Sequence, residues 1–392
     1  MNEKDVISIR SVFMLTTSFA PEPPGGAERQ LEYLSAYLSR QNIHVTIITR
    51  HLPSLARYEK KDGYEIIRVP QYGPGKFKTL TFVIGAIFTM LLRRNSFDIL
   101  HSHLVYSPAF AAVVAGKLIG KKTIVRFRSS GKGSDLVKSN KSWRGLIRMA
   151  VLKRWADCYV VLTDEMKDEL IVSGYESERI VRMNNGVDTD YFSPAKAGEK
   201  VVQRHVESIP SDKILLLYTG RFDPSKNLPL LLRATKKALD QCSNLHLILV
   251  GDGEEKERLV SLAGQLNIQA NVTFVDSTPN VREYLRKADI FVMSSSDEGI
   301  SNSLLEAMSC GLACISTNVG GANELLSGGL CGILVDPNNE NELSDSIVRL
   351  ALDPVTIKHY GGMARQRVVD NYSIASVGDG YINLYNSIVN RR

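Results

Sequence analysis

Two glutamates, Glu298 and Glu306, enclose a short segment that contains Gly, Ser and Asn. The segment leads into the apolar run at residues 304–310, which is typical of a loop that enters a helix. A helix N-terminus offers backbone N–H groups and a positive dipole end to an anion, while carboxylates nearby accept hydrogen bonds from sugar hydroxyls. The pattern therefore predicts a site for a ligand that carries both a phosphate and a sugar, as a nucleotide sugar does.

A purely structural interpretation of Glu306 is the alternative, because Ser303 and Glu306 also fit a capping box. In that motif the glutamate only bonds a backbone N–H at the start of the helix. The preceding residues favour the ligand site, since residues 288–293 are typical of a buried strand that ends just before Glu298. Open α/β sheets bind ligands at the carboxyl ends of their strands.

Short β-rich runs alternate with helical patterns in both halves of the chain, as in βα units with parallel sheets. The strands expected in the first half span residues 7–15, 45–49, 65–69, 98–101, 122–127, 158–162 and 179–183. Those in the second half span residues 213–218, 245–250, 272–275, 289–293, 313–316 and 332–335. The predicted fold class is therefore α/β, with two doubly wound, Rossmann-like domains.

A segment dense in turn-forming residues, 184–198, separates the two halves and is typical of a linker. It predicts an N-terminal domain over residues 1–190 and a C-terminal domain over residues 191–372. The last amphipathic pattern is followed by no strand, so we expect residues 373–392 to form a helix that crosses back to the N-terminal domain.

The net charge of +6 is unevenly distributed along the chain. Residues 1–195 contain 28 Lys and Arg against 19 Asp and Glu, whereas the remainder contains 20 against 23. Residues 117–154 contain twelve Lys and Arg and one acid, Asp135, which favours an anionic partner or a membrane surface. Nucleic acid is disfavoured, because zinc-finger spacing and an RNA-binding aromatic signature are both missing.

The longest apolar stretch, residues 80–92, ends at Arg93 and Arg94 and is too short to span a bilayer. It predicts either a core helix or an interfacial helix. The first ten residues lack the apolar region of a secretory signal, so we expect a cytoplasmic protein. Five cysteines in mostly apolar surroundings predict reduced, buried thiols, and no ligand set for a metal surrounds them.

Two further groups follow expected strands in the first half. Gly25 and Gly26 open a helix, where paired glycines let backbone N–H groups approach a phosphate, although a flexible turn is the alternative. His101 and His103 lie on one face of a strand end, because side chains alternate along a strand. They are candidates for substrate contact, for a structural role, or for a metal site that lacks a third ligand nearby.

In the second half, Arg221 and Lys226 lie at the start of a helix, where cations oppose the helix dipole. A bound polyanion would explain both, since arginine binds phosphate with two hydrogen bonds and lysine supplies a point charge. Solvated surface charge is the alternative. Gly251 belongs to a Gly-Asp-Gly turn after the next strand, and Gly320 and Gly321 open a further helix.

Together these motifs resemble the retaining family-four glycosyltransferases of GT-B fold, over nearly all of the chain. The resemblance rests on motifs that occur in this order: Asn185-Gly-Val-Asp188 with Phe192, Gly220-Arg221 with Lys226-Asn227, Gly251-Asp-Gly253, Glu298-Gly with Glu306-Ala-Met and Cys310-Gly311, and Gly320-Gly321 with Glu324. It implies two domains that face a cleft, with the nucleotide-sugar donor on the C-terminal domain and the acceptor on the N-terminal one.

The resemblance also implies roles for individual residues. Arg221 and Lys226 would hold the diphosphate, Glu306 the ribose hydroxyls and Glu298 the transferred sugar. The residues expected to take part in the chemistry are Glu298, His103, Arg221 and Lys226. The donor would further contact both domains through Gly25, Gly26, Gly251, Gly299, Ile300, Ser301, Asn302 and Glu306.

The same family implies retention of the anomeric configuration. Fixed cations at the leaving diphosphate would do what a metal does in other transferases. No Asp-x-Asp motif directly follows a strand, so we expect no metal and no cofactor besides the donor substrate. The expected partners are that nucleotide sugar, a glycan, lipid-linked or small-molecule acceptor, and an anionic membrane surface contacted peripherally.

The chain departs from the family pattern at three places. Residues 126–131 replace a His-Gly pair that many relatives carry, Ile300-Ser301 replaces Phe-Gly or Phe-Pro, and Asp276 replaces a frequent glycine. The identity of the donor therefore stays open. The alternative functions are a GT-B-fold nucleotide-sugar epimerase and a catalytically silent nucleotide-sugar-binding subunit.

Overall fold

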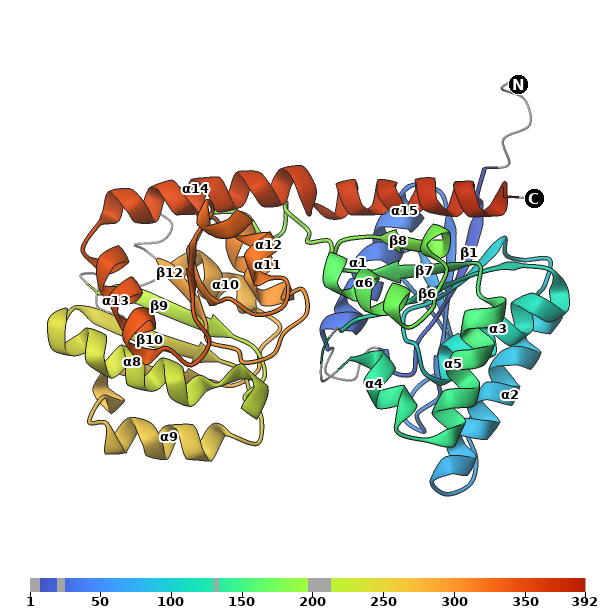
Figure 1. The fold of residues 1–392 in the computed structure, drawn as a ribbon, viewed down its shortest axis with the longest axis horizontal. Coiled ribbons are helices and arrows are strands. Elements are labelled where there is room, and N and C mark those ends of the chain that lie inside the picture. The colour runs from blue at the N-terminus through green and yellow to red at the C-terminus, as the bar shows by residue number, and fades with distance from the viewer. Residues whose placement is uncertain (1–7, 20–24, 130, 132–133, 197–212, 392) are drawn as a thin grey trace. The chain divides into compact units, whose positions relative to one another are not determined.

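The computed structural model describes residues 8–19, 25–129, 131, 134–196 and 213–391 (Figure 1). The chain divides into two compact units. Unit 1 contains residues 1–186 and 374–392, and unit 2 contains residues 187–373.

The described part of unit 1 contains an eight-stranded sheet with the order β3-β4-β2-β1-β5-β6-β7-β8. Neighbouring strands run parallel except at the edge, where β3 and β4 form an antiparallel hairpin. The strands are β1 (Ser11–Leu15), β2 (His44–Arg50), β3 (Tyr58–Lys61), β4 (Tyr64–Val69), β5 (Ile99–Ser102), β6 (Lys122–Arg126), β7 (Cys158–Val161) and β8 (Ile180–Arg182).

Two layers of helices cover the two faces of this sheet, because side chains alternate along each strand. Val12 and Met14 of β1 pack with α1 and α15, whereas Phe13 and Leu15 pack with α2 and α3. Helix α5 packs beside α3 on the second face (Figure 1). The helices are α1 (Gly26–Arg40), α2 (Lys76–Leu92), α3 (Ser107–Ile119), α4 (Asp135–Asn140), α5 (Trp143–Trp155), α6 (Asp164–Val172), the 3-10 helix η3 (Ser177–Arg179) and α15 (Ile374–Val389).

Helix α15 is part of the core of unit 1. Gly378 packs directly on the ring of Tyr37, because a Cβ at this glycine would lie 2.1 Å from Cδ1 of that ring. The hydroxyl of Tyr37 donates a hydrogen bond to Asp379 at 2.7 Å. The C-terminal helix therefore completes the N-terminal unit, as the sequence predicted.

The described part of unit 2 contains a six-stranded parallel sheet with the order β11-β10-β9-β12-β13-β14. The strands are β9 (Ile214–Thr219), β10 (Leu245–Val250), β11 (Val272–Val275), β12 (Ile290–Met293), β13 (Ala313–Thr317) and β14 (Ile333–Val335). The helices are the 3-10 helix η4 (Pro224–Lys226), α8 (Leu228–Gln241), α9 (Lys256–Gln265), the 3-10 helix η5 (Gln269–Asn271), α10 (Val281–Lys287), α11 (Asn302–Ser309), α12 (Ala322–Leu325), the 3-10 helix η6 (Ser327–Gly329), α13 (Glu340–Ala351) and α14 (Pro354–Asn371).

Each strand expected from the sequence is present, with ends that shift by a few residues, so the predicted fold class is confirmed. Residue 7 of the first expected strand lies outside the described residues. Strand β3 was missed, because its sequence Tyr-Glu-Lys-Lys lacks an apolar alternation. The turn that joins it to β4 nevertheless carries a hairpin signal, Asp62-Gly63, in which both residues have positive φ.

Helix α2 meets the expectation of a core helix for residues 80–92 on one of its faces only. One face of α2 is buried, through Phe82, Val83, Ala86 and Met90. The opposite face carries an exposed apolar stripe: Phe77, Leu80, Ile84, Phe88 and Leu92. None of the helices in the described ranges combines the length and apolar character that crossing a bilayer requires.

Candidate functional site

In unit 2, the turn between β9 and α8 places Lys226 at the carboxyl edge of the sheet. The turn is held by Asp223, whose carboxylate accepts hydrogen bonds from the backbone N–H and the hydroxyl of Ser225. Asn227 then adopts the left-handed conformation, with φ of 47°, and occupies the N-cap position of α8 without a side-chain capping hydrogen bond. The direction of the Lys226 side chain is therefore set by a short, well-bonded turn.

Lys226 forms an ion pair with Glu298 across this edge. Its Nζ lies 2.5 Å from Oε2 of Glu298, and the two side chains are 17% and 18% exposed. The hydroxyl of Ser295 donates to the same Oε2 at 3.3 Å. Among the described residues no donor contacts the second carboxylate oxygen, so Oε1 of Glu298 can accept a hydrogen bond from a ligand.

The backbones that carry the two members of the pair are joined by further hydrogen bonds. The hydroxyl of Ser294 donates to the backbone oxygen of Lys226 at 2.9 Å. The backbone N–H of Ser296 donates to the oxygen of Ser225 at 2.8 Å. The residues that follow β12 are thus bonded to those that follow β9, which fixes the separation of Lys226 and Glu298.

Arg221 lies in the same turn but is largely solvated. Its side chain is 81% exposed, and its Nε lies 3.7 Å from the carboxylate of Asp223. Tyr218 stabilises the turn, because its hydroxyl donates a hydrogen bond to the backbone oxygen of Arg221 at 3.0 Å. Tyr218 is a supporting residue that we did not predict; the signal was an aromatic residue at the strand end just before Gly220.

Helix α11 begins at Asn302, and its N-cap is Ser301 rather than Ser303. The Ser301 hydroxyl accepts a hydrogen bond from the backbone N–H of Leu304 at 3.3 Å. The capping-box interpretation of Ser303 and Glu306 is therefore wrong. Glu306 lies within the helix and is 2% exposed.

Glycines allow close backbone contacts around the pair. A Cβ at Gly320, where φ is 52°, would lie 1.8 Å from the backbone oxygen of Glu298. The N–H of Gly321 donates to the oxygen of Gly299 at 3.1 Å. At Gly251, with φ of 154°, a Cβ would lie 1.9 Å from the oxygen of Gly220. These glycines shape the loops that carry Glu298 and Arg221.

In unit 1, His103 follows the carboxyl end of β5 and belongs to a buried polar cluster with His101 and Arg126. The centroids of the two imidazole rings lie 4.2 Å apart, with the ring planes tilted by 37°, as expected for residues on one face. The hydroxyl of Tyr385 lies 2.8 Å from Nδ1 of His101. Arg126 hydrogen-bonds to the side-chain oxygen of Asn185, and its Nη1 lies 3.5 Å from Nδ1 of His103.

Both histidines are held neutral. Burial, followed by the charge of Arg126, lowers the pKa of His101 to about 3. Burial, followed by His101 and Arg126, lowers the pKa of His103 well below its usual value. Because a guanidinium only donates, its contact with Nδ1 leaves the proton of His103 on Nε2.

The Nε2 atom of His103 has no hydrogen-bond partner in the described part of the chain. The Nε2 atom of His101 also has no partner among the described residues, and buried polar atoms of this kind are available to a ligand or to water. Arg126 is the first residue of the segment 126–131, where the sequence departs from the family pattern.

Gly25 is the N-cap of α1, and Gly26 is the first residue of that helix. A Cβ at Gly25 would lie 2.6 Å from the carboxylate of Glu28, which also accepts a hydrogen bond from Ser18. The glycines thus lie at a helix start at the carboxyl end of β1. The loop at residues 20–24 lies outside the described residues.

The structure groups the expected site residues by unit. Unit 2 brings together Lys226, Glu298 and Gly299, with Arg221 in the same turn and Glu306 in the helix behind them. In unit 1, His103 lies beside Arg126. Within the described ranges, no group of three or more His, Cys, Asp or Glu side chains is arranged to hold a metal.

Two family models match the chain. The model described as Glycosyltransferase Family 4 matches residues 24–191, and the model described as Glycosyl transferases group 1 matches residues 200–367. The chain therefore belongs to the family-four glycosyltransferases, which use nucleotide sugars.

Individual relatives agree with this assignment. The N-acetyl-alpha-D-glucosaminyl L-malate synthase of Bacillus anthracis is 24% identical over 361 residues, which cover 91% of this chain and 92% of the relative. The UDP-Gal:alpha-D-GlcNAc-diphosphoundecaprenol alpha-1,3-galactosyltransferase of Escherichia coli is 25% identical over 309 residues, covering 76% and 78%. These relatives are a synthase and a transferase, which does not favour the epimerase or the silent subunit.

The fold is shared with solved structures. Anabaena Alr3699/HepE, in complex with UDP and glucose, superposes with a TM-score of 0.79 at 17% identity, over 96% of this chain and 100% of that one. This likeness establishes the GT-B fold, and the chemistry has to be argued from the residues of this chain.

Proposed function

We propose that this enzyme transfers a sugar from a nucleotide-diphosphate sugar to a hydroxyl of a phosphate-linked lipid acceptor, with retention of configuration and without a metal. The observation that carries the proposal is the Lys226–Glu298 ion pair at the carboxyl edge of the sheet in unit 2. Open α/β sheets bind ligands at this edge.

The cations of the site suit a departing diphosphate. Glu298 is the only carboxylate that contacts Lys226 among the described residues, and a bound diphosphate could share the ammonium with it. Arg221 is largely exposed and offers planar, paired donors to a phosphate. Charge fixed at the position where negative charge develops is commonly the largest contribution to catalysis.

The carboxylate of Glu298 suits the transferred sugar. One of its oxygens is held by Lys226 and Ser295, and the other faces no donor of the described chain. In unit 1, Nε2–H of His103 is a buried donor that has no partner among the described residues. We assign Glu298 to hydroxyls of the transferred sugar and His103 to a contact beside the reacting carbon.

The acceptor is assigned from the charge of the N-terminal half and from α2. Residues 117–154 carry twelve cations, of which Arg126 is buried beside His103, and one acid, and α2 exposes an apolar stripe. Reversible membrane binding generally needs both an apolar and a basic contribution. We therefore place the enzyme in the cytoplasm, in peripheral contact with an anionic membrane that carries its acceptor.

Donor hydrolysis in the absence of an acceptor tests the transferase chemistry. The protein is incubated with a panel of nucleotide-diphosphate sugars, and the released sugar is followed by NMR, which identifies the anomer first formed. We expect slow hydrolysis of one donor to the retained anomer. The inverted anomer would rule out retention, and a failure to hydrolyse or bind any donor would overturn the proposal.

A further inference from the structure

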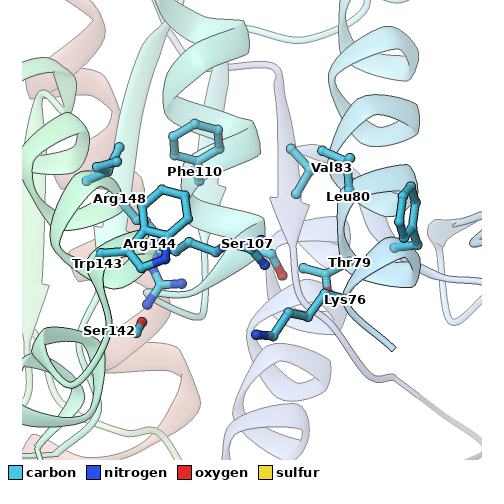
Figure 2. Close-up of a pocket in the computed structure, with 12 residues that line it drawn as sticks. Lys76, Thr79, Leu80, Val83, Ser107, Phe110, Ser142, Trp143, Arg144 and Arg148 are labelled. Atoms are coloured by element: carbon cyan, nitrogen blue, oxygen red, sulfur yellow. The ribbon is translucent and has the colours of Figure 1, made fainter. Parts of the chain in front are cut away.

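The surface of unit 1 has a groove between α2 and α5, with α3 as its floor (Figure 2). Its volume is about 620 Å³, within the range of pockets that hold small ligands. The residues that line this α2–α5 groove are Lys76, Phe77, Thr79, Leu80, Val83, Ser107, Phe110, Ser142, Trp143, Arg144, Ile147 and Arg148.

Large apolar side chains form the walls of the groove and remain exposed. Phe77 and Leu80 of α2 are 63% and 52% exposed, and Trp143 and Ile147 of α5 are 66% and 53% exposed. Single exposed apolar residues are common, but a cluster of this kind around a hollow marks an interaction site. The walls therefore suit a hydrocarbon chain.

One end of the groove is polar and basic. The first residues of three helices line the groove: Lys76 of α2, Ser107 of α3 and Trp143 of α5. Lys76 and Arg144 lie on opposite walls (Figure 2), and none of the lining residues is acidic. Helix starts and cations both favour a phosphate, whereas cations at helix starts are unfavourable without one.

This basic end is close in sequence to the expected acceptor side of the catalytic site. Ser107 stands four residues after His103, at the same carboxyl edge of the sheet in unit 1. Tyr106 lies between these two residues in the sequence. The centroid of its ring is 5.3 Å from the guanidinium carbon of Arg148, which also lines the groove. A ligand that bound with its phosphate at this end would direct the group attached to the phosphate toward the carboxyl edge of the sheet in unit 1, where His103 lies.

We propose that the α2–α5 groove binds the lipid carrier of the acceptor, a hydrocarbon chain headed by a phosphate or diphosphate. The chain lies between Phe77, Leu80 and Ile147, and the phosphate lies between Lys76 and Arg144. The inference rests on the proposed function, because it assigns the acceptor of that reaction. A phospholipid of the bilayer is the competing occupant, and a recessed groove favours a single chain over a flat membrane face.

The test uses Trp143 as a reporter within the groove. The chain has two tryptophans, so Trp155→Phe leaves Trp143 as the only one. The probes are farnesyl diphosphate, farnesol, inorganic diphosphate and phosphatidylglycerol vesicles. We expect farnesyl diphosphate to bind saturably and shift the Trp143 emission to the blue, with affinity at least about tenfold above that of farnesol or diphosphate alone.

Two kinds of variants distinguish binding of the hydrocarbon chain from binding of the phosphate. Leu80→Asp and Ile147→Asp should abolish the response to farnesyl diphosphate and to farnesol, and both sites are exposed enough for the protein to fold. Arg144→Ala should weaken the binding of farnesyl diphosphate but not the binding of farnesol. The matched controls are Val172→Asp, at an exposed apolar site on α6, and Arg40→Ala on α1, and neither should change binding.

The outcomes distinguish this inference from the proposed function. A protein that hydrolyses a nucleotide sugar but gives no Trp143 response to farnesyl diphosphate overturns the carrier site alone. A response to vesicles without one to farnesyl diphosphate assigns the groove to bilayer lipid and also overturns it. The variant Lys226→Ala should lose donor hydrolysis while it keeps farnesyl diphosphate binding.

Discussion

Replacement of Lys226 by alanine separates the catalytic role of the Lys226–Glu298 pair from its structural role. Loss of one preorganised group that stabilises developing charge lowers turnover by about 10² to 10³, or roughly 3 to 4 kcal/mol. The substitution also leaves Glu298, in a largely buried position, with Ser295 as its only side-chain partner in the described ranges. An uncompensated group of this kind costs about 1 to 3 kcal/mol of stability.

The second substitution, Glu298→Gln, distinguishes the two effects. In the Lys226→Ala background it removes the unpaired carboxylate, so the double variant should regain most of the lost stability. Activity should not return, because neither the ammonium nor the carboxylate is available to the donor. Urea unfolding measures the stability, and donor hydrolysis at saturating nucleotide sugar measures turnover.

The control is Lys236→Ala, which removes a lysine from the ion pair with Asp240 on the exposed side of α8. It should change neither turnover nor stability appreciably, since exposed pairs contribute little. If Glu298→Gln restored turnover together with stability, the pair would be a structural element and our assignment of Lys226 to the diphosphate would be wrong.

Four further outcomes are expected. Hydrolysis of the donor should persist in excess EDTA, and activity lost on chelation and restored by magnesium or manganese would contradict the metal-free mechanism. Glu306→Ala should weaken nucleotide binding in calorimetry more than it lowers the melting temperature; unchanged affinity with a large thermal loss would make Glu306 a core residue only. Because the pKa of His101 falls from 6.5 to about 3 on folding, the unfolded chain takes up its proton first as the pH drops, so stability declines below about pH 6.5. His101→Gln should remove about 2 kcal/mol of that decline by pH 5 in urea unfolding, and an unchanged pH profile would show that His101 is not the cause. The protein should sediment with anionic but not with neutral vesicles, because each Lys or Arg near the surface contributes about 1 kcal/mol to the binding free energy. Added salt should release it. Equal partitioning to both kinds of vesicle would contradict an electrostatic contact.

Local sequence patterns determined most of the secondary structure. The buried strands of both units were visible because parallel strands covered on both faces are continuous apolar runs. The candidate anion sites were visible because glycines and cations at strand ends are unusual in a merely solvated loop. Even the missed strand β3 left a local signal, in the Asp62-Gly63 turn.

Two local inferences needed the structure to settle them. The sequence suggested Ser303 as the N-cap of α11, whereas the structure has Ser301 in that position, with its hydroxyl accepting a hydrogen bond from the N–H of Leu304. Helix α2 was compatible with a core or an interfacial position, since its composition is apolar all round. Only its packing against α3 shows which face remains exposed.

The sequence alone thus determined the fold class, the family resemblance and the loops that carry the candidate site. Only the tertiary structure decided which side chains meet, because the partners are far apart along the chain and no local periodicity relates them. Lys226 and Glu298 are 72 residues apart, and Arg126 and Asn185 are 59 apart. Their contacts depend on strand order in the sheets, which brings the ends of non-consecutive strands to one edge.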